Sequence, residues 1–276
     1  MNIRKQFGNN DVSFGKVILV GAGPGDVELL TIKALKTIES AKVIIFDNLV
    51  SEEIRQLFPS HAKKIYVGKA KGHHSATQDE INNLLVSYAQ NGEDVCRVKG
   101  GDAFVFGRGS EEMLFLAQRG IQVEVVPGVT AASGCTSYAH IPLTHRGIAQ
   151  GCTFITAHAD KELDLNWSVL AKLNQTLVIY MGLSKTELIT QELIRGGMAD
   201  TMPVALIENG CTPQQRVFTG DITQLSALKR KHKVQSPALI VVGEVVSIAS
   251  KMQWLTGLSS QAEFLKTEQL DLCIPA

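Results

Sequence analysis

Runs of apolar, mostly β-branched residues alternate with amphipathic stretches over the first half of the chain. Val17–Val20 has the pattern of a buried strand, and Val43–Phe46 that of a second. Between them, apolar residues recur every three or four positions from Val27 to Ala41, which predicts one face of a continuous helix. This alternation is typical of α/β folds. It predicts three further strands, at Ile65–Val67, Val95–Val98 and Val123–Val126.

Capping residues predict where two other helices begin. Thr77 followed by Glu80 matches a capping box, and the helix that it opens should end near Asn91–Gly92. Ser110 is expected to cap a shorter helix that ends at Gly120.

A polar stretch within Pro142–Gly151 interrupts the pattern, and a second series of strands and helices follows it. Its expected strands are Thr153–Thr156, Thr176–Tyr180, Val204–Ile207, Arg216–Thr219 and Ala238–Val242. We therefore predict two α/β lobes, residues 15–145 and 146–256. The remaining residues, 257–276, have no clear pattern and are expected to form a tail.

The charge balance argues against a nucleic-acid partner. The 276 residues include 27 basic and 27 acidic side chains, whereas proteins that bind nucleic acids usually carry a basic surplus. The dense basic run Lys229–Lys233 closes a predicted helix. Cations at that end complement the helix dipole, so we interpret the run as a solvated helix end.

Cysteine usage and apolar segment lengths favour the cytoplasm. The five cysteines are never spaced as CxxC, which argues against a disulfide framework or a structural zinc site. The first fifteen residues lack the apolar core of a signal peptide, and no segment is apolar for long enough to span a bilayer. We expect no membrane association.

Three glycine-bearing loops each follow a predicted strand. The first, Gly21–Asp26, is not a dinucleotide fingerprint, because Asp26 stands where the third glycine belongs and Pro24 lacks a backbone N–H. A tight turn without a ligand is the alternative. The other two loops are Lys99–Gly109 and Pro127–Ala132. Ligands of open parallel sheets lie outside the carboxyl ends of the strands, so the three loops are expected to converge on one small-molecule site.

Four motifs in these regions, GAGPGD, VKGGDAFVFGRGSEE, VVPGVTAASG and IPLTHRG, resemble the uroporphyrinogen-III C-methyltransferases of the tetrapyrrole methyltransferase family. The likeness runs from about Lys16 to Trp254. It implies a two-lobed class III methyltransferase fold with the active site in the cleft between the lobes. It also implies methyl transfer from S-adenosyl-L-methionine to C2 and C7 of uroporphyrinogen III. The products would be S-adenosyl-L-homocysteine and, through precorrin-1, precorrin-2 for siroheme or cobalamin biosynthesis. A homodimer without a metal is implied as well.

The resemblance also assigns roles to residues that match the family motifs. Asp47 and Lys69 fall at the positions of a proton acceptor and a proton donor, and Arg108 where a substrate carboxylate is held. The positions implied to contact the methyl donor are Pro24, Gly100, Gly101, Asp102, Val105, Thr130, Ala131, Met181 and Gly210.

Residue chemistry alone leaves these roles open. Asp47 could equally be a turn or capping aspartate, and Lys69 an ordinary solvated loop residue. A neutral protein that binds a substrate with eight carboxylates must concentrate cations locally, which adds Lys71 and Arg146 to the substrate-binding candidates. Arg108 is the best suited, because its planar guanidinium can hold a carboxylate with two hydrogen bonds.

Three other functions are alternatives to uroporphyrinogen methylation. A methyltransferase acting on precorrin-2 or a later corrinoid would share the first glycine loop, but typically lacks the combined GGDxFxFGRG and PLTHR motifs. A nicotinamide-dependent oxidoreductase is disfavoured by the missing third glycine. A non-catalytic carrier of porphyrinogen or donor would bind ligand without turnover, and nothing in the sequence favours it.

Overall fold

The structure is a computed structural model that describes residues 14–68, 76–158, 165–249 and 251–252. It divides into two compact units. The first unit contains the described residues up to Cys135, with Glu208–Arg216 and Gln235–Leu239. The second contains the described residues of Thr136–Ile207, Val217–Val234 and the part from Ile240 onward.

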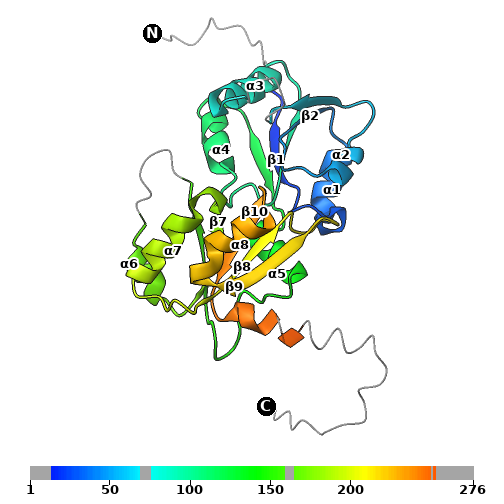
Figure 1. Cartoon of the computed structure of the whole chain (residues 1–276). Coiled ribbons are helices and arrows are strands. Elements are labelled where there is room, and N and C mark those ends of the chain that lie inside the picture. The colour runs from blue at the N-terminus through cyan, green and yellow to red at the C-terminus, as the bar shows by residue number, and fades with distance from the viewer. Residues whose placement is uncertain (1–13, 69–75, 159–164, 250, 253–276) are drawn as a thin grey trace, which may run out of the picture. The chain divides into compact units, whose positions relative to one another are not determined.

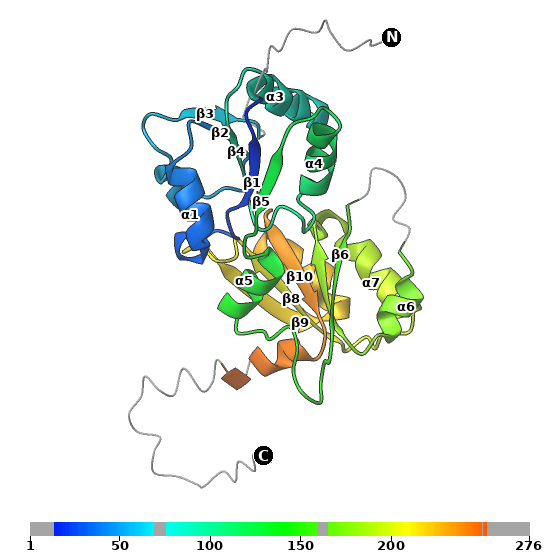
Figure 2. The ribbon, with the colours of Figure 1, turned by 180° about the vertical axis from the view of Figure 1, so that it is seen from behind.

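The first unit is built on a parallel five-stranded sheet in the order β3-β2-β4-β1-β5 (Figures 1 and 2). Its strands are β1 (Val17–Gly21), β2 (Val43–Phe46), β3 (Lys63–Tyr66), β4 (Val95–Lys99) and β5 (Val123–Val126). Because the strands are parallel, all of them end at the same edge of the sheet. The loops that follow β1, β4 and β5, three neighbouring strands, are therefore brought together there.

Helices cover both faces of this sheet (Figure 1). On one face, α1 (Ile32–Glu39) and α2 (Glu52–Gln56) pack over the even-numbered side chains of the central strands, among them Val20 and Ile44. On the other, α3 (Gln78–Gln90) and α4 (Gly109–Ala117) cover odd-numbered residues such as Leu19. Successive strand residues point to opposite faces, so each strand contributes to two apolar layers.

The second unit is organised around a mixed sheet in the order β6-β7-β10-β8-β9. Its strands are β6 (Cys152–Thr156), β7 (Thr176–Tyr180), β8 (Pro203–Glu208), β9 (Arg216–Asp221) and β10 (Ala238–Val242). β6 runs parallel to β7, and β10 antiparallel to it. The later helices are α5 (Ala131–Tyr138), α6 (Trp167–Lys172), α7 (Thr186–Arg195) and α8 (Leu225–His232). Short 3-10 turns are η1 (Val27–Leu29), η2 (Leu183–Lys185) and η3 (Ile222–Gln224).

The predicted α/β class is confirmed, but two helix predictions are wrong in detail. The helix expected from Val27 to Ala41 is divided, because Leu30 is extended and the side chain of Thr31 caps a new helix by accepting from Ala34 N. The cap expected at Ser110 is not there: α4 begins at Gly109, after Arg108 in the left-handed conformation without a side-chain cap.

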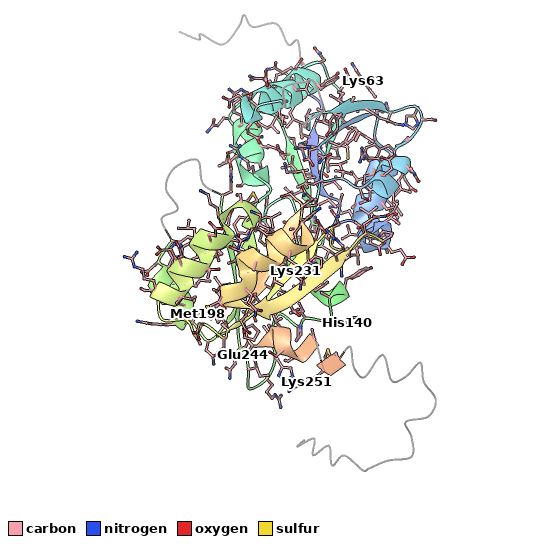
Figure 3. All side chains as sticks on the ribbon, viewed as in Figure 1. Lys63, His140, Met198, Lys231, Glu244 and Lys251 are labelled. Carbon is pink, nitrogen blue, oxygen red and sulfur yellow. The ribbon has the colours of Figure 1, made fainter. Side chains whose placement is uncertain are left out.

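Other local predictions are confirmed. Thr77 and Glu80 form both hydrogen bonds of a capping box at the start of α3. The basic run closes α8, where Lys231 lies in the last turn (Figure 3).

Within the described part of the chain, no helix combines the length and apolar character needed to cross a membrane.

Candidate functional site

The three glycine loops meet at the carboxyl edge of the first sheet, as predicted. Gly23 N donates to Gly101 O at 3.1 Å, and Gly101 N donates to Gly23 O at 2.7 Å. These reciprocal bonds join the loop after β1 to the loop after β4. The loop after β5 contacts both, because Gly128 lies against Gly21 and Gly101.

Two of these contacts leave no room for a side chain. A Cβ atom at Gly128 would lie 2.4 Å from Gly101 O, and one at Gly21 would lie 2.6 Å from Gly128 N. Real Cβ contacts essentially never fall below 3.0 Å. Glycine is thus required here for close backbone packing. We call this arrangement of loop main chain around Gly21, Gly101 and Gly128 the cradle, and it lies at the sheet edge where open parallel sheets bind their ligands.

Asp102 ties two of the loops together. One carboxylate oxygen accepts from Phe104 N at 2.8 Å within its own loop, and the other accepts from Gly128 N at 3.0 Å. Each oxygen retains a second lone pair, so a ligand hydroxyl or ammonium could still be held by this side chain. The neighbouring Val105 is half-buried.

Other residues that are predicted to contact the methyl donor lie in the same unit. A Cβ at Gly101 would be 3.9 Å from Ala131 N, so the start of α5 is next to the cradle. Thr130 precedes it, and its carbonyl accepts from Gly134 N. Pro24 faces the same helix, because a Cβ at Gly134 would lie 2.5 Å from Pro24 Cγ.

The loop after β8 also reaches this region within the first unit. A Cβ at Gly25 would lie 3.1 Å from Gly210 O and 2.8 Å from the methyl group of Thr212. Gly210 itself lies against the Cys135 side chain. The structure therefore brings together several residues of the first unit that are predicted to contact the methyl donor, among them Pro24, Gly101, Ala131 and Gly210.

Asp47 directly follows β2 and lies beside the second glycine loop. A Cβ at Gly100 would be only 2.6 Å from Leu49 Cβ, so the loop after β2 packs closely against the loop after β4. One Asp47 oxygen accepts from Leu49 N at 3.0 Å, the turn role that its chemistry alone suggested. The other accepts from Arg97 Nη2 at 3.2 Å. Asp47 is therefore held at two points, with 26% of its side chain exposed.

A buried charge cluster that was not predicted from the sequence lies behind Asp47. Arg97 and Lys99 are 2% and 5% exposed on β4, and Glu112 on α4 is fully buried. Glu112 Oε1 accepts from Lys99 Nζ at 3.0 Å and from Gln78 Nε2 at 3.1 Å, and lies 3.5 Å from Arg97 Nε. With Asp47, the cluster contains two cations and two carboxylates. Burial lowers the pKa of Lys99, an effect that the charge of Arg97 adds to and that of Glu112 opposes.

Arg108 is exposed and already paired with a carboxylate. Its Nη2 lies 2.6 Å and its Nε 3.0–3.1 Å from the oxygens of Glu111, one turn along α4. The hydrogen bond from Arg108 lowers the pKa of Glu111. Arg108 and Phe106 both have positive φ, at 58° and 53°. Such conformations are uncommon outside glycine and concentrate at functional sites.

The remaining four predicted residues lie either in the second unit or outside the described residues. Met181 and Arg146 belong to the second unit, where both are exposed. Met181 follows β7 with a φ of 55°, another left-handed residue at the end of a strand. Lys69 and Lys71 lie outside the described residues.

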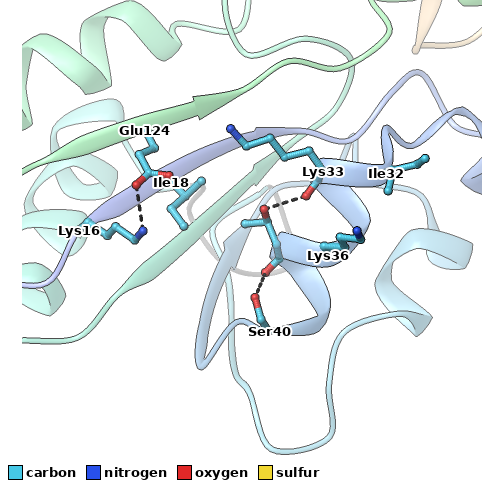
Figure 4. Close-up of a pocket in the computed structure, with 8 residues that line it drawn as sticks. Lys16, Ile18, Ile32, Lys33, Lys36, Ser40 and Glu124 are labelled. Atoms are coloured by element: carbon cyan, nitrogen blue, oxygen red, sulfur yellow. Dashed lines mark hydrogen bonds and ion pairs between the residues drawn. The ribbon is translucent and has the colours of Figure 1, made fainter.

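A shallow groove of about 620 Å³ lies elsewhere on the first unit, along α1 (Figure 4). Its wall includes Lys33 and Lys36, and an ion pair of 2.9 Å joins Lys16 to Glu124 across it. None of its lining residues is a predicted site residue, and it contains no cluster of catalytic groups. The glycine cradle is the better candidate site.

The described residues contain no group of three or more His, Cys, Asp or Glu side chains placed to hold a metal ion.

Comparison with known proteins gives a consistent picture. Residues 16–226 match the model of the tetrapyrrole (corrin/porphyrin) methylases. The chain is 50% identical to siroheme synthase 2 of Yersinia enterocolitica over 256 residues, covering 90% of this chain and 54% of that protein. It is 52% identical to the siroheme synthase of Acinetobacter baylyi over 242 residues, covering 87% of this chain and 53% of that protein. The chain thus spans about half the length of these curated relatives.

Solved structures provide the second comparison. The uroporphyrin-III C-methyl transferase of Thermus thermophilus, complexed with S-adenyl homocysteine, superposes with a TM-score of 0.74 at 40% identity, covering 85% of this chain and all of that one. A cobalt precorrin-4 methyltransferase matches with a TM-score of 0.75 at 24% identity, covering 88% and 99%. The latter likeness concerns the fold alone.

Proposed function

The chain belongs to the tetrapyrrole (corrin/porphyrin) methylase family, and from this premise we propose that it is an S-adenosyl-L-methionine-dependent uroporphyrinogen-III C-methyltransferase. It would methylate C2 and then C7, giving precorrin-2 through precorrin-1 and two molecules of S-adenosyl-L-homocysteine. Synthesis of siroheme or cobalamin would use the product. The observation that carries this proposal is the cradle formed by Gly21, Gly101 and Gly128. Its support from comparison is the Thermus protein, whose whole length this chain matches at 40% identity.

The cradle suits the methyl donor better than a nucleotide phosphate. Pro24 offers no N–H to a phosphate, and Asp26 would repel one. We assign donor contacts to the nine predicted positions, eight in the first unit and Met181 in the second. The Asp102 carboxylate would accept from a donor hydroxyl or ammonium, while Gly100 and Gly101 allow the main chain to approach closely.

When bound, the donor supplies an electrophilic methyl group, so the protein needs no covalent nucleophile of its own. The main contribution of this chain is orientation: holding two reactants in line can lower a barrier by about 7–11 kcal/mol. The tight packing of the three loops supports this role, because their main chain has little freedom to shift.

After methyl transfer the ring must lose a proton, which comes from a position other than the methylated carbon because that carbon bears no hydrogen, and we assign Asp47 as the acceptor. Its carboxylate is held by Leu49 N and by the buried Arg97, which fixes its direction at the edge of the sheet. Lys69 is the proposed proton donor. Arg108, with Lys71 and Arg146, is proposed to bind substrate carboxylates. Glu111 would then have to release Arg108 or share it with the substrate.

Asp47→Asn tests the assignment of the base. The amide keeps the size of the side chain but cannot accept a proton, so we expect turnover to fall by about 10²–10⁴-fold. Donor affinity, measured by calorimetry, should stay within twofold. Undiminished turnover would show that Asp47 is not the base.

Arg108→Ala tests the assignment of the substrate anchor. We expect KM for uroporphyrinogen III to rise while donor affinity is unchanged. Glu111→Ala provides the matched control: it removes the competing carboxylate, so substrate affinity should stay the same or increase. Loss of donor binding in Arg108→Ala, with an unchanged KM for the ring, would refute the assignment.

Oligomeric state and location are part of the same proposal. By family resemblance we propose a cytoplasmic homodimer, without a nucleic-acid or membrane partner. Sedimentation equilibrium of the purified chain checks the first point, since a monomer at micromolar concentration would contradict it.

A further inference from the structure

Two cysteines that are distant in the sequence meet inside the first unit. Cys135 lies on α5, and Cys211 lies in the loop after β8. Both are buried, at 5% and 1% exposure, and neither is in a disulfide. The interaction between their side chains shifts the pKa values of both thiols. Such a pair is chemically different from the isolated cysteines elsewhere in the described residues.

Two glycines make this contact possible. A Cβ at Gly210 would lie 2.2 Å from Cys135 Sγ, and a Cβ at Gly134 would lie 3.1 Å from Cys211 Sγ. Each sulfur therefore packs against the backbone next to the other cysteine. Because neither glycine has a side chain, the two segments pack closely and bring the two cysteines near each other.

The pairing makes the two thiols unequal. The hydrogen bond from Cys135 lowers the pKa of Cys211, and the same bond, together with burial, raises the pKa of Cys135. By contrast, burial raises the pKa of Cys96 to about 12 and that of Cys152 to about 11. Among the described cysteines, Cys211 is thus the one favoured as a thiolate, which is the reactive form.

We propose that Cys135 and Cys211 form a dithiol modification site that a hydroperoxide oxidises to a disulfide. In the first step the Cys211 thiolate attacks one peroxide oxygen and the O–O bond breaks, which leaves a sulfenic acid on Cys211 and releases hydroxide. Cys135 then loses its proton and its sulfur attacks Cys211 Sγ, which expels the second oxygen as water. In sum, two thiols and hydrogen peroxide give one disulfide and two waters.

Oxidation at this place would affect the donor site, a consequence that rests on the proposed function. A disulfide has an S–S length of about 2.05 Å, well below the separation of two hydrogen-bonded thiols. Closing that gap would move Cys135 Sγ from its contact with Gly210 and so disturb the packing of the Gly210 loop against α5. Gly210 and Ala131, at the start of α5, are both assigned to the donor site. The oxidised protein should therefore bind the donor more weakly than the reduced one.

Peptide mapping of the full chain tests the site without reference to activity. A Cys273→Ser background removes the thiol that lies outside the described residues. After treatment with hydrogen peroxide and alkylation of free thiols, we expect one disulfide-linked peptide pair containing Cys135 and Cys211, reversed by dithiothreitol. Cys152→Ser, the matched control on β6, should leave this pair intact, whereas Cys135→Ser and Cys211→Ser should both abolish it.

Donor affinity is then measured by calorimetry on the reduced and oxidised protein. We expect at least a fivefold weaker affinity after oxidation, restored by the reductant and absent in Cys135→Ser. The absence of the disulfide from the map of the Cys273→Ser protein, or oxidation at Cys152 instead, would overturn the proposed site. A complete disulfide with unchanged donor affinity would overturn its effect. If the reduced protein bound no donor at all, the proposed function would fail, while the map would still decide on the dithiol.

Discussion

Replacing Gly128 by alanine should separate the three loops of the cradle. The φ of Gly128 lies outside the left-handed region, so its backbone conformation admits alanine and only space opposes the change. The new Cβ would lie 2.4 Å from Gly101 O, about 1 Å short of the 3.4 Å at which ordinary contact begins. Because the obstruction is main chain on both sides, the loops must move apart.

The expected size of the effect follows from this displacement. Overpacking of this kind typically costs about 1–3 kcal/mol, and in a chain of this size each kcal/mol lowers Tm by roughly 2–4 °C. A misplacement of about 1 Å in a site that works by orientation can lower the rate by about 100-fold. We therefore expect Gly128→Ala to fold with a Tm lowered by several degrees, and its donor Kd to rise at least tenfold.

Gly120→Ala is the matched control. Nothing lies within 4 Å of a Cβ at Gly120, but its φ of 73° disfavours alanine, by about 1–2 kcal/mol. The two variants should lose similar stability, and only Gly128→Ala should lose donor affinity, as measured by calorimetry beside thermal denaturation. If Gly128→Ala bound the donor within twofold of the wild type, the cradle would not be the donor site.

Two further predictions concern buried groups. Glu112→Ala leaves Arg97 and Lys99 buried with Asp47 as their remaining partner in the cluster. We therefore expect the free energy of unfolding, measured by denaturant titration, to fall by about 3–5 kcal/mol. A loss below 1 kcal/mol would show that these cations do not depend on Glu112. Burial raises the folded-state pKa of Cys96 to about 12. Its contribution to stability is thus complete below the unfolded value near 9 and is lost as pH rises toward 12. Wild type should therefore lose more stability than Cys96→Ala between pH 9 and 12, and parallel curves would refute this.

Much of the fold could be predicted because strand and helix patterns differ in period. The parallel strands of the first sheet were found from short apolar runs, and the convergence of the glycine loops followed from where such strands end. The break between Val27–Leu29 and α1 was missed, because apolar residues keep helical spacing across it. The sequence signal that could have located this break is Thr31, a residue type that favours the N-cap position and caps α1 here.

Residues of the candidate site could be predicted only where a sequence motif marks them. The motifs indicated the tetrapyrrole methylases, and that family assignment is confirmed. The charge cluster behind Asp47 was missed, because Arg97 in a strand is ordinarily a solvated edge residue. Its burial depends on Glu112, which reaches it from a helix that begins ten residues after the strand ends. No sequence pattern within β4 indicates that Glu112 is its partner.

An anaerobic assay of the purified chain with uroporphyrinogen III and S-adenosyl-L-methionine is the sharpest test of the proposed methyltransferase activity. Mass spectrometry of the tetrapyrrole and quantification of S-adenosyl-L-homocysteine are the readouts. We predict a ring that has gained two methyl groups, with two molecules of S-adenosyl-L-homocysteine formed for each ring. If uroporphyrinogen stayed unchanged while the protein methylated precorrin-2, or bound the donor without turnover, the proposed activity would be wrong.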